Sequence, residues 1–257
     1  KLWRDGLALE CGISLLPVMC FTKEYTDLPP WSGIMMGCQN LSDEIVKKYS
    51  ELHRRNYIHG HHFVTVTCEP SKFLPYLEKK FTSRGGRIIK KKIEDFSELK
   101  HHDLIINCTG LYSRYLNSDN TVKPIRGQII RVEAPWQFHV EIDDSDDGHY
   151  IIPNQYCAIL GGTHQTGDDD TTPRQNEAEF IFNGCTQLVP SLKSAKILRH
   201  QAGLRPGRHS IKLELETKRI DGKIVNIIHN YGHGGSGVTL CYGCAGEVVE
   251  LAEEALR

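Results

Sequence analysis

A glycine-rich turn between a short apolar strand and a helix constrains the fold of this chain more than any other segment. Residues 227–239 read Ile-Ile-His-Asn-Tyr-Gly-His-Gly-Gly-Ser-Gly-Val-Thr, with glycine at 232, 234, 235 and 237. Glycine adopts backbone angles closed to other residues and lets a flat or anionic group approach the main chain. Amides at the start of the next helix, near Val238 and Thr239, would face negative charge. A tight strand-to-helix connection without a ligand is the alternative.

Composition limits the classes of protein to consider. The 257 residues are 39% hydrophobic and 25% charged, enough for a real core in one large domain or two small ones. Lys plus Arg number 31 against 32 for Asp plus Glu, which argues against a nucleic-acid partner. The most apolar run, Leu104 to Cys108, is far shorter than the roughly 20 residues that a bilayer requires. We expect a soluble globular protein without a nucleic-acid or membrane partner.

Cysteine and histidine spacing does not predict a metal site. Nine cysteines lie scattered in apolar surroundings, as free thiols do in a reducing compartment. Cys241 and Cys244 form the one close pair, but a second pair at zinc-like spacing is missing. His59, His61 and His62 lack an acidic or cysteine partner at ligand spacing, so a solvated loop is expected there.

The two ends of the sequence indicate a fragment or a processed chain. The sequence opens at Lys1 without a signal peptide, and it closes at Arg257 inside an expected helix that begins at Ala245.

Periodicity predicts an α/β fold in which a strand-helix part is followed by a part rich in longer strands. Strands are expected at 13–21, 33–37, 63–67, 87–90 and 104–107, with helices at 42–55 and from Glu69-Pro70-Ser71 to Gly85-Gly86. From Ile125 onward we expect an antiparallel or mixed sheet from 128–132, 149–152 and 158–161, a helix at 176–188 and a strand at 211–216. The run 224–228 then returns the chain to the first α/β sheet and leads into the glycine turn.

Several motifs resemble one known family in order along the chain. His229-Asn-Tyr-Gly-His-Gly-Gly-Ser-Gly-Val-Thr239 resembles the carboxy-terminal flavin signature of the D-amino-acid oxidase and D-aspartate oxidase family. Six further segments agree with it: Ile106-Asn-Cys-Thr-Gly110, Arg126-Gly-Gln-Ile-Ile130, Ala134-Pro-Trp136, Tyr150-Ile-Ile-Pro153, Leu160-Gly-Gly-Thr163 and Gly203-Leu-Arg-Pro206. The resemblance covers nearly the whole chain from about Phe63 onward and is weaker before that residue. The family's amino-terminal Gly-x-Gly-x-x-Gly segment, which holds the FAD pyrophosphate, has no counterpart in this sequence.

The resemblance implies a domain organisation. An incomplete, Rossmann-like FAD-binding domain would comprise residues 63–125 and 225–257. A mixed-sheet α+β substrate domain, residues 1–62 and 126–224, would be interleaved with it. Because the pyrophosphate segment is missing, we expect this chain to hold FAD weakly or not at all.

The resemblance also implies residue roles. Arg205 would grip the substrate α-carboxylate through a bidentate fork, Tyr150 would share that carboxylate, and the Gly235 carbonyl would receive the substrate amine. Residues of the turn and the following helix start would lie against the flavin ring, and others would contact the rest of FAD. The first set is Gly234, Gly235, Ser236, Gly237, Val238 and Thr239; the second is Ile93, Thr109 and Gly110. His229 and His233 receive no acid-base role.

The implied reaction is FAD-dependent oxidative deamination of a D-amino acid by oxygen, giving a 2-oxo acid, ammonia and hydrogen peroxide. His164 stands where acidic-substrate relatives carry arginine and neutral-substrate relatives carry an aromatic residue. Imidazole titrates near neutrality, so we favour acidic substrates, D-aspartate or D-glutamate, with Arg208 as a further cation nearby. Tyrosine often replaces Ser236 in neutral-substrate relatives.

Two other functions remain open at this stage. One is a neutral D-amino-acid, glycine or sarcosine oxidase on the same fold; the other is an inactive fragment that serves as a binding module. The family resemblance implies a peroxisomal location, although the sequence stops before any targeting tripeptide. The oligomeric state cannot be read from the sequence.

Overall fold

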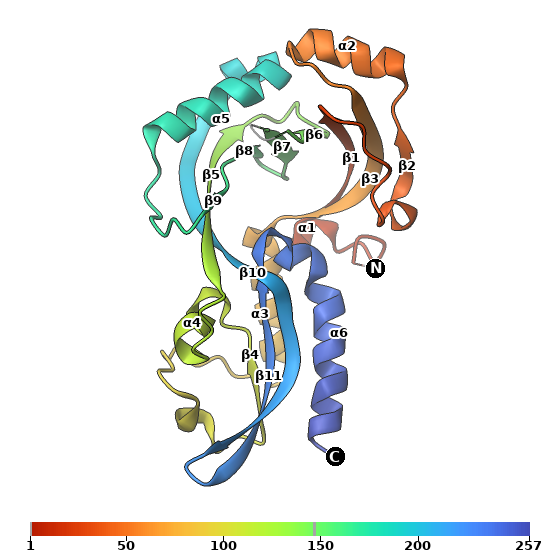
Figure 1. Cartoon of the computed structure of the whole chain (residues 1–257). Coiled ribbons are helices and arrows are strands. Elements are labelled where there is room, and N and C mark those ends of the chain that lie inside the picture. Colours follow the sequence, from red (N-terminus) through yellow and green to blue (C-terminus); the bar gives the residue numbers. More distant parts are fainter. Residues whose placement is uncertain (1, 146–147) are drawn as a thin grey trace. The chain divides into compact units, whose positions relative to one another are not determined.

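The computed structural model of the protein describes residues 2–145 and 148–257 (Figure 1). The chain divides into two compact units, each assembled from three separate stretches. Unit 1 contains residues 1–88, 128–163 and 172–202, and unit 2 contains residues 89–127, 164–171 and 203–257. Two long strands, β5 (Lys123–Glu133) and β10 (Lys196–Ile220), contribute residues to both units.

Unit 1 combines strands, three longer helices and short helical turns. The strands are β1 (Ile13–Thr22), β2 (Met36–Asn40), β3 (His59–Cys68), β6 (Val140–Asp143), β7 (Tyr150–Pro153) and β8 (Ala158–Gly161), with residues from β5 and β10. The helices are α1 (Ala8–Cys11), α2 (Asp43–His53), α3 (Pro70–Ser83) and α5 (Gln175–Leu188), with the 3-10 turns η1 (Ser32–Ile34) and η4 (Pro190–Ser194).

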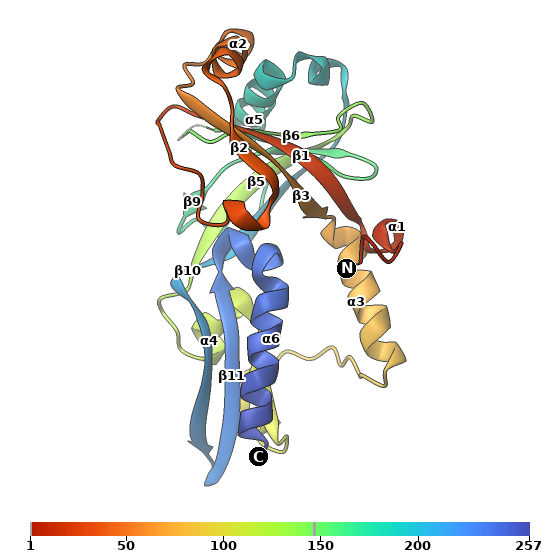
Figure 2. The same ribbon diagram turned by 90° about the vertical axis from the view of Figure 1, so that its right-hand side faces the viewer.

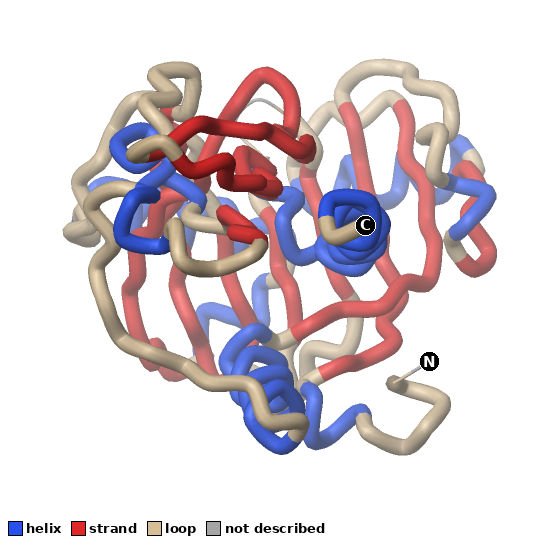
Figure 3. Tube along the Cα trace, turned by 90° about the horizontal axis from the view of Figure 1, so that it is seen from below, coloured by secondary structure: helices blue, strands red, loops and turns tan. Residues whose placement is uncertain are grey.

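The sheet of unit 1 is mixed. Its strands pair in the order β2-β3-β1-β6-β7-β8-β5. β1 runs antiparallel to β3 along its whole length, from Ile13 opposite Cys68 to Thr22 opposite His59, and parallel to β6. The pairs β6-β7, β7-β8 and β8-β5 are antiparallel. In Figure 3 the strands are drawn as red tubes, several of which lie side by side.

Helix α5 covers part of this sheet and closes the largest core of unit 1. Buried residues of β5, β7 and β8 meet Ala178, Ile181 and Cys185 of the helix. The Cys185 thiol lies 3.6 Å from the carbonyl oxygens of Tyr150 and Gly161. Burial raises the pKa of this thiol to about 12, so it stays uncharged at neutral pH.

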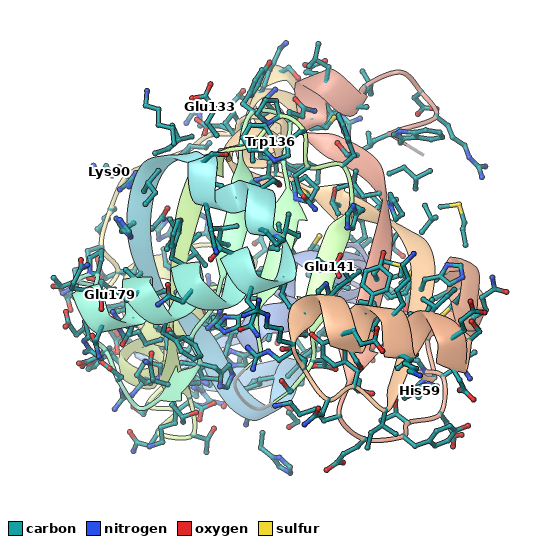
Figure 4. The ribbon with its side chains drawn as sticks, turned by 90° about the horizontal axis from the view of Figure 1, so that it is seen from above. His59, Lys90, Glu133, Trp136, Glu141 and Glu179 are labelled. Atoms are coloured by element: carbon teal, nitrogen blue, oxygen red, sulfur yellow. The ribbon has the colours of Figure 1, made fainter. Side chains whose placement is uncertain are left out.

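Unit 1 also buries a polar cluster around Glu141 of β6, which is labelled in Figure 4. His139 Nε2 lies 2.7 Å from one carboxylate oxygen of Glu141, and His53 Nε2 lies 3.5 Å from the other. The hydrogen bond to Glu141 raises the pKa of His139, whereas burial lowers that of His53. Glu141 raises the pKa of both histidines, but burial outweighs its effect at His53.

Unit 2 is smaller, and its longest helix lies along its longest complete strand. Its complete elements are β4 (Leu104–Asn107), β9 (Gln165–Thr166), β11 (Lys223–His233), α4 (Ser113–Leu116), α6 (Gly237–Ala255), and the 3-10 turns η2 (Phe96–Leu99), η3 (Gly110–Tyr112) and η5 (Gly234–Ser236). β11 pairs antiparallel with β10 and parallel with β4. α6 packs along β11 (Figure 2).

The core of unit 2 lies where β4 and β11 meet η2 and α4. Its buried members are Phe96, Ile105, Leu116, Val225 and Ile227. Parallel pairing of β4 with β11 sets Ile105 opposite Ile227 and Asn107 opposite His229. The ends of both strands, and the turns that follow them, therefore lie at the same edge of the unit.

Most of the predicted elements are confirmed. Helix 42–55 is α2, which Ser42 caps by accepting a hydrogen bond from the Ile45 amide, with Asp43 and Glu44 in its first turn. Helix 176–188 is α5, and the helix begun at Pro70 is α3. Strands 13–21, 63–67, 104–107, 128–132 and 158–161 lie within β1, β3, β4, β5 and β8. The return of 224–228 to an earlier strand is confirmed by its parallel pairing with β4.

Two more strands are confirmed: the one expected at 149–152 is β7, which begins at Tyr150, and the one expected at 211–216 lies within the longer β10. Two other expectations were wrong. Residues 87–90 form no strand within the described chain, and Ile88 and Ile89 are exposed. The strand expected at 33–37 lies at Met36–Asn40, after η1.

The strands predicted at 63–67 and 104–107 belong to one mixed sheet but are not neighbours in it. β3 pairs antiparallel with β1 and β2 in unit 1, whereas β4 pairs with β11 in unit 2. An isolated strand signal does not identify its partner, because pairing depends on distant residues. The assignment of FAD-binding and substrate-binding roles to chain segments stays a prediction.

Helices long and apolar enough to cross a membrane are absent from the described part of the chain.

Candidate functional site

The glycine turn of unit 2 opens the main chain to its surroundings. Gly232 has φ of +88° and Gly234 has φ of +56°, angles that favour glycine. A Cβ added at Gly234 would meet no described atom within 4 Å. Gly235, Ser236, Val238 and Thr239 are all exposed. The turn therefore offers backbone rather than side chains to a neighbouring group.

Helix α6 begins directly after this turn. Among the described residues, its amino terminus has no side-chain capping hydrogen bond from Ser236. The first amides of a helix lack acceptors within the helix and carry a partial positive charge. Together with the glycines, this end of α6 fits a flat or anionic group.

Arg205 lies beside the turn because of the pairing between β10 and β11. Gly207 is opposite His233, so the same register carries Arg205 to Gly235. A Cβ at Gly235 would lie 3.7 Å from Arg205 Cδ, an ordinary van der Waals contact. The predicted carboxylate-binding arginine and the predicted amine-binding glycine are thus neighbours.

Gly127 provides the space for the Arg205 guanidinium. A Cβ built on Gly127 would lie 2.2 Å from Arg205 Nη1 and 2.4 Å from Nη2, closer than any real contact. Gly127 is buried on β5. A residue larger than glycine at this point would displace the guanidinium.

Thr109 and Gly110 approach the same region from the end of β4. Gly110 has φ of +57°, and a Cβ there would lie 3.9 Å from Pro206, the residue after Arg205. The Asn107 side-chain oxygen accepts from the Thr109 amide at 3.2 Å and from the Thr109 hydroxyl at 2.7 Å. These bonds fix the turn that leads from β4 into η3.

His164 is exposed and lies just before β9. β9 pairs with β5 so that Arg126 is opposite Gln165. Continued by one residue, this antiparallel register brings His164 opposite Gly127, where the Arg205 guanidinium is seated. Arg126, which precedes Gly127 on β5, is fully buried and donates from Nε to the Asp170 carbonyl at 2.6 Å.

Arg208 is held on the other side of the turn. Its Nε lies 3.1 Å from Asp119 Oδ2, and its side chain lies against Gly232. The same Asp119 oxygen accepts from the Tyr231 hydroxyl at 2.9 Å. Burial raises the pKa of Asp119, but hydrogen bonds from Thr121 and Tyr231 and the Arg208 charge outweigh it, and the pKa falls to about 2.

Tyr150 belongs to unit 1, at the start of β7. It pairs with Gly161 of β8, and its ring lies across this glycine and Gly162. A Cβ at Gly161 would lie 2.0 Å from Tyr150 Cζ, and one at Gly162 would lie 2.8 Å from the hydroxyl. The pair of glycines in Leu160-Gly-Gly-Thr163 therefore seats the tyrosine ring.

Ile93 lies outside the regular elements of unit 2, and its half-buried side chain packs against the core formed around Phe96. Because the side chain is part of this core, only the backbone of Ile93 could contact a ligand.

Unit 2 brings together most of the residues predicted from the sequence. Arg205, Gly235, Gly110 and His164 all converge on one stretch of β5, β10 and the glycine turn. Sequence reasoning did not assign a role to Gly127, although it lies in a quoted motif. It also missed Asn107 and Asp119; Asn107 lies in another quoted motif, whereas Asp119 carries no sequence signal.

In the part of the chain that the structure describes, neither a metal site nor the pocket named below includes the predicted site residues. Across the described ranges, His, Cys, Asp and Glu side chains do not form a group of three able to hold a metal ion. Unit 1 contains an open pocket of about 380 Å³ between Leu16, Phe138 and Tyr156. Among the described residues, none of those predicted for the site lines this pocket.

The glycine turn, the start of α6 and Arg205 lie close together in unit 2, and the sequence motifs predict them as parts of a flavin-dependent oxidoreductase site. The chain belongs to the FAD dependent oxidoreductase family, which residues 18–251 match. It is 36% identical to human D-aspartate oxidase over 232 residues, 90% of this chain and 66% of that protein. It is 41% identical to a D-amino acid oxidase of Dugesia ryukyuensis over 198 residues, 75% of this chain and 59% of that protein.

Solved structures share the fold at low sequence identity. The glycine oxidase of Geobacillus kaustophilus superposes with a TM-score of 0.77 at 16% identity, covering 98% of this chain and 76% of that one. The chain spans less than two thirds of the length of the first two relatives above, 66% and 59%.

Proposed function

We propose that the protein catalyses FAD-dependent oxidative deamination of D-amino acids, with a preference for acidic ones. One observation carries the proposal: the Arg205 guanidinium is seated against Gly127 and lies beside Gly235 of the exposed glycine turn. The names of the relatives, D-aspartate oxidase and D-amino acid oxidase, support the substrate class.

The cofactor would be held by backbone groups of unit 2. Gly234 through Thr239 would lie against the flavin ring, where the α6 amides stabilise negative charge. Thr109, Gly110 and the backbone of Ile93 would contact the rest of the molecule. When bound, FAD supplies the acceptor for a hydride taken from the substrate Cα and returns the electrons to oxygen as hydrogen peroxide.

The substrate would be oriented by three groups of the chain. Arg205 would donate two parallel charge-assisted hydrogen bonds to the α-carboxylate. A third, from the Tyr150 hydroxyl, rests on the family resemblance. The Gly235 carbonyl accepts from the substrate amine. The chain contributes positioning and electrostatic stabilisation to this reaction rather than a proton-transferring side chain.

Preference for acidic substrates would come from His164. The β5-β9 register directs this exposed residue to the stretch of β5 where Arg205 is seated. A protonated imidazole there would meet the second carboxylate of D-aspartate or D-glutamate. We expect His164→Phe to reduce activity with D-aspartate relative to D-alanine.

The proposal is tested by measuring peroxide release with added FAD and D-aspartate, D-glutamate, D-alanine or glycine. We expect Arg205→Lys to raise KM for D-amino acids about tenfold or more, because a lysine cannot form the bidentate pair. Arg219→Lys is the matched control, since Arg219 lies on the same strand and donates to the Gly222 carbonyl. A lack of peroxide with every D-amino acid would refute the proposed function, and a preference for glycine would replace it with glycine oxidation.

A further inference from the structure

A buried histidine of unit 2 remains without a role in the proposed reaction. His229 lies on β11 with a side chain that is 0% exposed, opposite Asn107 of β4. Its Nδ1 lies 3.1 Å from Asn107 Nδ2, and its Nε2 lies 2.8 Å from Glu216 Oε2. Both ring nitrogens therefore have defined partners.

The hydrogen bonds around Asn107 define where the imidazole proton resides. The Thr109 amide can only donate, so the Asn107 atom that it contacts must be the oxygen. The Asn107 NH2 group then faces His229 Nδ1, which must accept and is therefore unprotonated. The single ring proton lies on Nε2 and is donated to the Glu216 carboxylate.

The charges around His229 support the neutral ring. From β10, the Glu216 carboxylate faces it, but Lys218 Nζ lies 3.2 Å from the same carboxylate oxygen, and Lys212 adds a further positive charge. The other elements around the ring contribute Asn107 of β4, the Phe96 ring of η2 and the Tyr231 ring of β11. Burial lowers the pKa of His229 despite the opposing effect of Glu216.

We propose that His229 is a positioning residue whose neutral imidazole holds the Asn107 amide so that its oxygen fixes the Thr109-Gly110 turn for FAD. This inference rests on the proposed function, in which that turn contacts the cofactor. A proton on Nδ1 sets two donors against each other. Asn107 must then turn its oxygen toward His229 and its NH2 group toward the Thr109 amide, and the turn loses its support.

The first arm of the test reads the chain without a cofactor. Nitrogen-15 NMR of histidine-labelled protein at pH 7 should show His229 with an unprotonated Nδ1 and a protonated Nε2, assigned by the signal missing in His229→Gln. An imidazolium or the opposite tautomer at this pH would overturn the proposal.

The second arm uses two variants that each retain half of the ring's function. His229→Asn places a side-chain oxygen near the Nδ1 position, opposite Asn107, whereas His229→Gln keeps a donor near Nε2, opposite Glu216. Hydrogen exchange of the Thr109 amide should accelerate about tenfold or more in His229→Gln and much less in His229→Asn. Equal effects in both variants, or no effect in either, would contradict the positioning role.

FAD titration followed by flavin fluorescence completes the test. We expect the FAD dissociation constant to rise about tenfold in His229→Gln, with His229→Asn near wild type, and to rise in wild type as the pH falls through the lowered pKa of His229. Weak FAD binding by wild type agrees with the expectation from the sequence. If wild type binds no FAD at any concentration, the proposed function fails for this chain, while the tautomer and Thr109 exchange still decide the role of His229. If FAD binds but its affinity is the same in both variants, the inference fails alone.

Discussion

At the scale of single residues, glycines make room for the polar side chains of the candidate site. Gly127 leaves space for the Arg205 guanidinium, and Gly161 leaves space for the Tyr150 ring. The motifs in the sequence predicted Arg205 and Tyr150 as site residues. The contacts of these two side chains with Gly127 and Gly161 were not predictable, because strand pairing brings together residues that are distant in the sequence.

Replacement of Gly127 should damage the site and spare the fold. In Gly127→Ala, the new methyl group meets the far end of a flexible side chain, so Arg205 moves and the strand stays in place. We expect KM for D-amino acids to rise about tenfold or more through loss of a charge-assisted pair. Thermal unfolding and steady-state kinetics check this, with Gly246→Ala on α6 as the control; a large loss of stability with unchanged KM would contradict it.

Asp119 should make stability depend on acid pH. Its pKa in the fold is about 2, below the ordinary value of 3.8, so its contribution is complete above 3.8 and is lost as the pH falls toward 2. In Asp119→Asn, the free energy of unfolding should fall by about 1–3 kcal/mol at neutral pH, since Arg208 and Tyr231 lose an ionised partner. Urea unfolding of both proteins at several pH values measures this, and the difference should shrink in acid.

At the scale of elements, sequence patterns found helices and strands better than partners. α2 and α5 carry strong local signals, such as the Ser42 cap, and were placed almost to the residue. The run at 87–90 has strand-forming residues, but Ile89 is 78% exposed and the run forms no described strand. β3 and β4 were both predicted as strands, but nothing in the prediction told that one pairs antiparallel with β1 and the other parallel with β11.

Two helical glycines should respond in opposite directions to alanine. Gly184 of α5 packs on the buried His149 ring, where an added Cβ would lie 1.9 Å from Nε2. We expect Gly184→Ala to lower the free energy of unfolding by about 1–3 kcal/mol through overpacking. A Cβ added at Gly246 of α6 would meet no described atom within 4 Å, so Gly246→Ala should raise the free energy of unfolding by about 0.5–1 kcal/mol. Denaturant unfolding of the two variants measures both changes. If the free energy of unfolding changes in the same direction in both, the packing inferred at Gly184 is contradicted.

At the scale of the whole molecule, each unit is assembled from segments that are distant in sequence. Unit 2 draws on residues 89–127, 164–171 and 203–257, so no continuous segment contains its Arg205, Gly127 and Thr109 together. Periodicity cannot reveal such an assembly, because it reports on one stretch of chain at a time. Periodicity predicted the α/β class, and the resemblance of ordered motifs added the expectation that the two domains are interleaved along the chain.

The balance of charge should control solubility. The net charge is −1 at pH 7 and the isoelectric point is about 7.0, so electrostatic repulsion between molecules is weakest near neutrality. We expect solubility at low salt to pass through a minimum near pH 7 and to increase toward about pH 6 and pH 8. Light scattering across this range checks the prediction, and a monotonic change would contradict it.

The buried thiol of Cys185 would resist the hydrogen peroxide that the proposed reaction releases. The thiolate is the form that peroxide attacks, and a pKa raised to about 12 keeps Cys185 in the thiol form. Cys20 of β1 is also buried, with its pKa raised to about 12 by burial and by the charges of Asp144 and Asp143. Two cysteines inside unit 1 are thus chemically protected against the oxidant that the proposed reaction releases.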